Sequence, residues 1–95
     1  VKDLGKDKEE ILNILDLILL WYRDVLMYKV TKNPNLLLYK KETSSISKQA
    51  KVVSYEGIQN TIKGVEIAKT RINSNVNLET TLQLMLFTIK ENSND

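Results

Sequence analysis

The stretch from residue 8 to residue 29 constrains the fold most, because its apolar side chains cover more than one side of a helix. Its polar positions fall along one narrow strip at helical spacing, and nearly all the others are apolar. Such a helix lies at the centre of its domain, or packs on its own fold with one side and on a partner with another. Its longest uncharged run, Leu17 to Tyr22, has six residues. A bilayer-spanning helix needs about 20, so we expect no membrane contact.

Turn and capping residues divide the rest of the chain into three more helices. Residues 33–35, Asn-Pro-Asn, are expected to end the first helix and reverse the chain. One of residues 43–45, Thr-Ser-Ser, is expected to cap a short helix that ends near Val52. Ser54 and Asn77 are expected to cap two longer helices. With only three glycines and one proline, the chain is predicted to be all-α, a small bundle of about four helices in a single domain.

The spacing of apolar residues predicts which side of each later helix is buried. Beside the buried side of the helix expected at 54–73 runs a row of small residues, which predicts close packing against another helix. Two large apolar residues of the last helix, Leu84 and Phe87, lie off its core face and suggest a partner surface. The small row is Gly57, Thr61, Gly64 and Ala68; the expected core residues are Leu36, Leu37, Leu38, Ile46, Ala50, Tyr55, Ile58, Ile62, Val65, Ile72, Leu78, Leu82, Met85, Leu86 and Ile89.

The residue types present exclude most catalytic chemistry. The chain has no cysteine and no histidine, so it lacks thiolate nucleophiles, imidazole bases and the usual ligands of transition metals. Its glycines are isolated, so no phosphate-binding loop is present. The paired carboxylates near the amino terminus lie in a charged stretch that is expected to be solvated, where acid–base catalysis is not favoured. We therefore expect no catalytic residues, no metal site and no cofactor.

Positive charge is concentrated in the middle of the chain. Residues 25–53 contain six lysines and one glutamate, a net charge of +5 in a chain whose total is +2. This segment, and Lys40 and Lys41 in particular, could contact nucleic-acid phosphates. A solvated lysine-rich loop is the favoured alternative, because the segment contains no arginine and lysine is abundant throughout the chain.

Several motifs in this order resemble one known domain. A leucine-rich helix carries Trp21-Tyr22-Arg23-Asp24-Val25-Leu26, and Asn75-Val76-Asn77 precedes the last helix. Together they resemble the carboxy-terminal domain of a clamp-loader subunit of bacterial DNA polymerase III, of the delta-prime type. The resemblance covers residues 11–90. The equivalent domain of the gamma/tau subunit remains an alternative, and so does a small helical nucleic-acid-binding module.

The resemblance implies an interaction domain, residues 1–95, from a longer cytoplasmic subunit whose AAA+ region is absent here. In that family, these domains pack into a collar that holds the clamp loader together, so the implied partners are the gamma/tau and delta-type subunits. The sliding clamp and DNA would be reached only through the full complex. A ring of subunits requires two different patches on each. The candidate interface residues are Trp21, Arg23, Asp24, Gly57, Gly64, Leu84 and Phe87.

Overall fold

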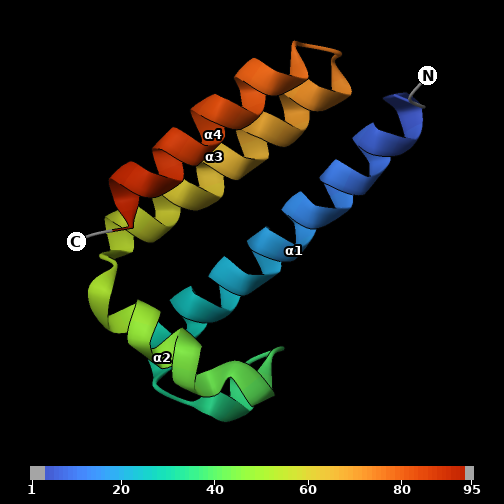
Figure 1. The fold of residues 1–95 in the computed structure, drawn as a ribbon. Helices are drawn as coiled ribbons and strands as arrows, with labels where there is room; N and C mark the ends of the chain where they lie inside the picture. Colours follow the sequence, from blue (N-terminus) through green and yellow to red (C-terminus); the bar gives the residue numbers. More distant parts are fainter. Residues whose placement is uncertain (1–3, 94–95) are drawn as a thin grey trace.

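The computed structural model describes residues 4–93, which form four α-helices joined by short connections (Figure 1). The helices are α1 (Leu4–Thr31), α2 (Thr43–Val52), α3 (Tyr55–Asn73) and α4 (Leu78–Asn92), and two 3-10 turns, η1 (Pro34–Leu36) and η2 (Lys40–Glu42), precede α2. No strand occurs in this range. The predicted all-α bundle is therefore confirmed. None of the helices described is both long and apolar enough to span a membrane.

Local capping explains where most helices begin and end. The side chains of Ser54 and Asn77 accept backbone N–H groups of Gly57 and Thr80, each at 2.9 Å, which confirms both predicted caps. The predicted cap of α2 was wrong. Its N-cap is Glu42, which makes no side-chain capping bond, because the preceding 3-10 turn already bends the chain into the helix.

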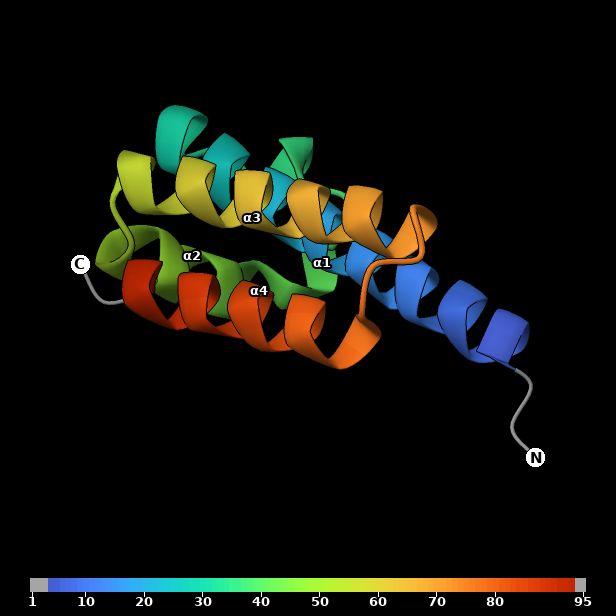
Figure 2. The same ribbon diagram turned by 90° about the horizontal axis from the view of Figure 1, so that it is seen from above.

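The helices are arranged with α3 in the middle. It packs against both α1 and α4, whereas α2 packs against the carboxy-terminal half of α1 (Figures 1 and 2). The molecule is elongated, with extents of 46 × 25 × 17 Å. Helices α1 and α4 both pack on α3 but contact each other little. Apolar side chains on α1 that face α4, and on α4 that face α1, are therefore only partly covered.

Two adjoining clusters of buried side chains make the core. One joins α1 to α2 and the start of α3, and the other joins the first half of α1 to α3 and α4. The first contains Tyr22, Val25, Leu37, Ile46, Ala50, Val53 and Ile58; the second contains Leu15, Val65, Ala68, Ile72 and Met85.

Four residues expected in the core are exposed instead. Leu36 is the last residue of η1, and Leu38 follows the buried Leu37, whose backbone is extended; both flanking side chains are exposed. Tyr55 is the first residue of α3 and lies at the surface beside Lys29. Leu86 lies next to Leu82 on the surface of α4 and is exposed, and α1 and α4 contact each other little.

Candidate partner interface

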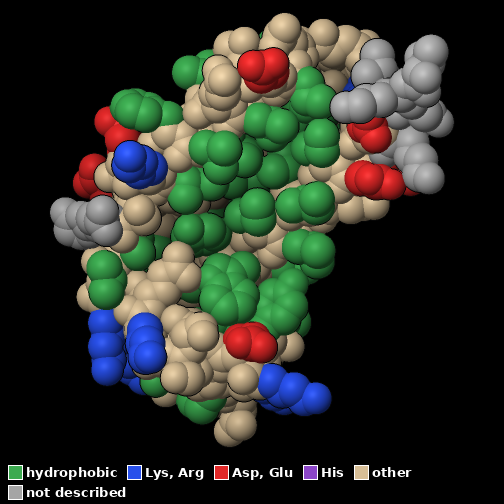
Figure 3. Space-filling model, in the orientation of Figure 1, with side chains coloured by type: hydrophobic (Ala, Val, Ile, Leu, Met, Phe, Trp, Pro, Cys, Tyr) green, Lys and Arg blue, Asp and Glu red, His purple; other side chains and the backbone are tan. Residues whose placement is uncertain are grey.

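Apolar side chains from α1 and α4 gather on one face of the molecule, where they form a continuous green band in Figure 3. On α1, Ile14, Leu17 and Trp21 recur at helical spacing and share one side. On α4, Leu82 and Leu86 do the same, and Leu82 packs against the cluster that α1 and α3 also form. We call these five residues the α1–α4 face. Ile14, Leu17 and Leu86 are 54, 56 and 59% exposed.

The position of α2 explains why the apolar side of α1 is exposed in the first half of the helix and covered in the second half. Val25 lies nearly on the same side of α1 as Ile14, but α2 covers it with Ile46 and Ala50, so that Val25 is fully buried. The first half of α1 has no such cover among the described residues. A single helix therefore carries a buried segment and an exposed apolar segment along one side.

Trp21 stands where the two segments meet and is only half-buried. Its indole Nε1 donates a hydrogen bond to Oε1 of Gln49 on α2 at 2.7 Å, and Gln49 Nε2 donates to the Tyr22 hydroxyl at 3.2 Å. Its ring also lies against that of Tyr39, with 5.9 Å between the ring centres. Trp21 is thus held by α2 and η2 in a defined orientation while part of its ring stays at the surface.

The expectation that Asp24 contacts a partner was wrong. Asp24 is fully buried, and its carboxylate accepts backbone N–H groups of Leu38 at 3.0 Å and Tyr39 at 2.8 Å. The Arg23 guanidinium lies 3.5 Å from the same carboxylate, but its side chain is 48% exposed. Asp24 therefore has a structural role within the domain, and of this pair Arg23 alone lies at the surface.

Gly57 and Gly64, both predicted to contact a partner, lie against α4 of the same domain. A Cβ at Gly57 would lie 2.6 Å from the Asn92 carbonyl oxygen, and one at Gly64 would lie 2.9 Å from Cγ2 of Thr88. The predicted close helix contact is therefore present, but the second helix is α4 of the same domain. The small residues let α4 approach α3 closely.

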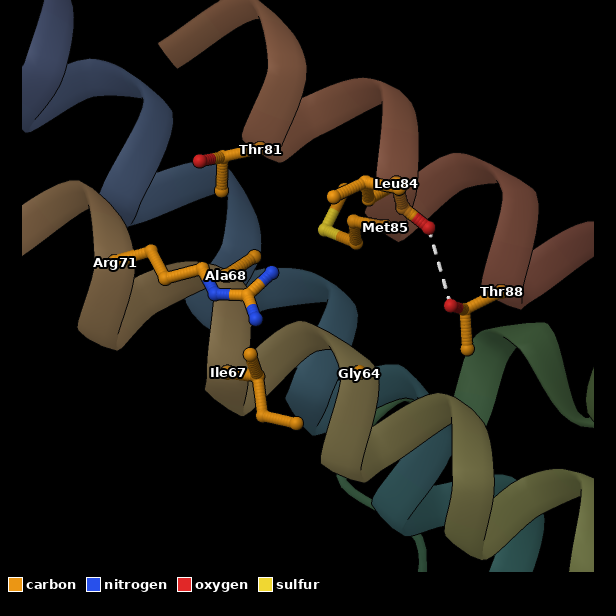
Figure 4. Close-up of a pocket in the computed structure, with 8 residues that line it drawn as sticks. All are labelled: Gly64, Ile67, Ala68, Arg71, Thr81, Leu84, Met85 and Thr88. Carbon is orange, nitrogen blue, oxygen red and sulfur yellow. Dashed lines mark hydrogen bonds between the residues drawn. The ribbon is translucent and has the colours of Figure 1, made fainter. Parts of the chain in front are cut away.

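Leu84 and Phe87 are exposed on α4, outside the core as predicted. Leu84 lies on the opposite side of α4 from Leu86 and lines a pocket of about 120 Å³ between α3 and α4, together with Ile67 and Arg71 (Figure 4). The floor of this pocket includes Gly64 and Ala68. Exposed apolar side chains therefore occur on two separate sides of α4.

The chemistry available at these surfaces is that of packing and hydrogen bonding. Within residues 4–93, no group of three or more carboxylates is placed to hold a metal ion. Lys40 and Lys41 are exposed on η2, at the end of the molecule formed by α2. Sequence reasoning missed Ile14, Leu17 and Leu86 as individual surface residues. The available signal was that α1 is apolar on more than one side.

Comparison with known proteins gives two matches. The family model described as "DNA polymerase III, delta subunit, C terminal" matches residues 3–90. The DNA polymerase III subunit delta' of Bacillus subtilis (strain 168) is 34% identical to the chain over 77 residues. That match covers 81% of the chain but 23% of the relative, so the chain spans about a quarter of the relative's length. No solved structure matches the chain significantly.

Proposed function

Because the chain belongs to the family formed by the carboxy-terminal domains of DNA polymerase III delta subunits, we propose that it is the collar domain of a delta-prime clamp-loader protein. It binds neighbouring subunits of the loader, of the gamma/tau and delta types, and has no catalytic role of its own. It is one domain of a longer cytoplasmic protein, whose AAA+ region lies outside this chain. It reaches the sliding clamp and DNA through the assembled complex.

The exposed α1–α4 face carries this proposal. Isolated apolar residues are common on protein surfaces, but a continuous apolar face over two helices is typical of an interface. Burying a large aliphatic side chain stabilises a contact by about 1.5–3 kcal/mol, so Ile14, Leu17 and Leu86 together can supply much of the binding free energy. Trp21 lies half-buried at the edge of the face. Tryptophan is enriched among the interface residues that contribute most to the binding free energy.

Binding of the purified chain to the other clamp-loader subunits tests the proposal. We expect the unmodified chain to co-elute with them in size-exclusion chromatography. Ile14→Glu and Leu86→Glu should each abolish co-elution, because a charge would be buried without a partner. Since both side chains are exposed in the free domain, the helical circular dichroism and the unfolding midpoint of each variant should stay close to those of the unmodified chain.

Val30→Glu is the matched control. Val30 is 62% exposed near the end of α1 and is not part of the α1–α4 face, so this variant should co-elute like the unmodified chain. If the unmodified chain fails to associate where the full-length protein assembles, the proposal is wrong. If the Glu variants at positions 14 and 86 bind as well as the Val30 variant, the domain binds through another surface.

A further inference from the structure

We propose that the lysine-rich end of the molecule binds the phosphate backbone of a nucleic-acid strand. The fold brings lysines from three segments to the end formed by α2: the last turn of α1, the 3-10 turn η2, and α2 itself. This inference does not depend on the proposed interaction with clamp-loader subunits. The lysines are Lys29, Lys32, Lys40, Lys41, Lys48 and Lys51.

These positive charges are not neutralised within the part of the chain that the structure describes. Its two ion pairs are Arg23–Asp24 and Lys69–Asp16, and neither includes a lysine of this end. Lys29 is partly engaged, since its Nζ donates to the Ala50 carbonyl oxygen at 2.8 Å. The other five lysines are exposed, and clustered charges of one sign attract a polyanion.

The other end of the molecule is close to neutral. Residues 1–10 contain three lysines and four acidic residues, a net charge of −1, compared with +5 for residues 25–53. In Figure 3 several basic side chains lie at the α2 end. A polyanion is therefore attracted more strongly to α2 and η2 than to the start of α1.

The chemistry favours a nucleic acid over an acidic peptide. Lysine acts as a point charge toward phosphates. The lysines also spread over three segments and do not converge on one cavity, which fits an extended backbone. Tyr55 is half-exposed at this end, and Lys29 Nζ lies over its ring at 5.0 Å from the ring centre. An aromatic ring and a positive charge therefore lie together where a base and its phosphate can bind.

Fluorescence anisotropy of a labelled oligothymidylate, titrated with the chain at several salt concentrations, tests the inference. We expect a dissociation constant of about 10⁻⁵ M or tighter at physiological salt, weakening as salt rises. The double variant Lys40→Ala, Lys41→Ala should lower the slope of log K against log salt by about 1.4, because each phosphate contact on a single strand contributes about 0.7. Tyr55→Ser should weaken binding several-fold through lost stacking.

The double variant Lys8→Ala, Lys63→Ala removes the same charge outside this end and should bind within about twofold of the unmodified chain. The inference is overturned if no binding is detected at low salt, or if the two double variants lose affinity equally. It is also overturned if an Asp- and Glu-rich peptide displaces the oligothymidylate at an equal concentration of charges, because the end would then be a site for acidic proteins.

Discussion

The carboxylate of Asp24, in the carboxy-terminal part of α1, accepts a hydrogen bond from the backbone N–H of Tyr39 at 2.8 Å. Its other oxygen accepts the N–H of Leu38 at 3.0 Å. These two N–H groups belong to the extended connection between η1 and η2, which forms no regular ladder. Asp24 therefore fixes the path of the chain from α1 to α2, and with it the position of the α2 residue Gln49 that holds Trp21.

Replacing Asp24 should destabilise the domain strongly. In Asp24→Ala, the backbone N–H groups of Leu38 and Tyr39 lose the fully buried carboxylate that accepts them, which should cost about 2–4 kcal/mol of unfolding free energy. Asp24→Asn keeps one acceptor oxygen but points an NH₂ group at an N–H donor, so its cost should be smaller, about 1–2 kcal/mol. Urea unfolding followed by circular dichroism measures both values.

Asp16→Ala is the control for this prediction. Asp16 also lies on α1 and pairs with Lys69 on α3, but it is half-exposed, so its loss should change the unfolding free energy by less than about 1 kcal/mol. Equal destabilisation by the Asp16 and Asp24 variants would show that the two backbone hydrogen bonds to Asp24 do not contribute the expected amount, about 2–4 kcal/mol, to the stability of the domain.

Gly64 should couple energetically to Thr88 across the α3–α4 contact. Alanine is favoured over glycine inside a helix by about 1 kcal/mol, but the new Cβ would lie 2.9 Å from Thr88 Cγ2. We expect Gly64→Ala to destabilise the domain by about 1 kcal/mol net. In a Thr88→Ser background the obstructing methyl is gone while the hydroxyl bond to the Leu84 carbonyl can remain, so the same substitution should stabilise.

A double-mutant cycle of these four proteins measures the coupling. The four unfolding free energies should give a coupling of about 1–2 kcal/mol between positions 64 and 88. If Gly64→Ala changes the unfolding free energy equally in both backgrounds, the Thr88 methyl group does not obstruct a side chain at position 64, and α3 and α4 are not in close contact there.

The starts of α3 and α4 could be predicted because they depend on residues close together in the sequence. Ser54 and Asn77 each satisfy an N–H three residues later, and Asn75, in the predicted polar loop, adopts a left-handed conformation with φ of 61°. Each of these features is determined by a short segment and its own side chains. No distant neighbour is needed to specify them.

The candidate interface could be predicted only in part. The spacing of apolar residues shows which side of a helix is apolar, but it does not show whether another helix covers that side. Leu86 has the spacing of a core residue but is exposed, and α1 and α4 contact each other little. Gly57 and Gly64 indicate a close helix, and the helix that approaches them in the structure is α4 of the same domain. The sequence places Asp24 next to Arg23, but its N–H donors come from residues 14 and 15 positions later.

Lys32 is a position where glycine should stabilise the fold. It follows the last residue of α1 with φ of 57°, and its N–H donates to the Tyr28 carbonyl oxygen at 2.8 Å. A side chain in this left-handed conformation is disfavoured, so Lys32→Gly should raise the unfolding free energy by about 0.5–1 kcal/mol. Lys32→Ala removes the same charge but keeps the Cβ, and should give no such gain. Thermal unfolding of both variants decides whether the backbone or the charge is responsible.

The two exposed sides of α4 should bind different neighbours, if the domain takes part in a collar. A ring built from non-equivalent contacts needs two patches on each subunit, and Leu84 and Leu86 point to opposite sides of the helix. Pairwise binding to each isolated neighbour separates the two contacts. Leu84→Glu combined with Phe87→Glu should abolish binding to one partner and leave the other within about twofold, whereas Leu86→Glu should do the reverse. If both variants lose binding to the same partner, both sides of α4 belong to a single interface. Two separate interfaces would each be affected only by substitutions on their own side of the helix.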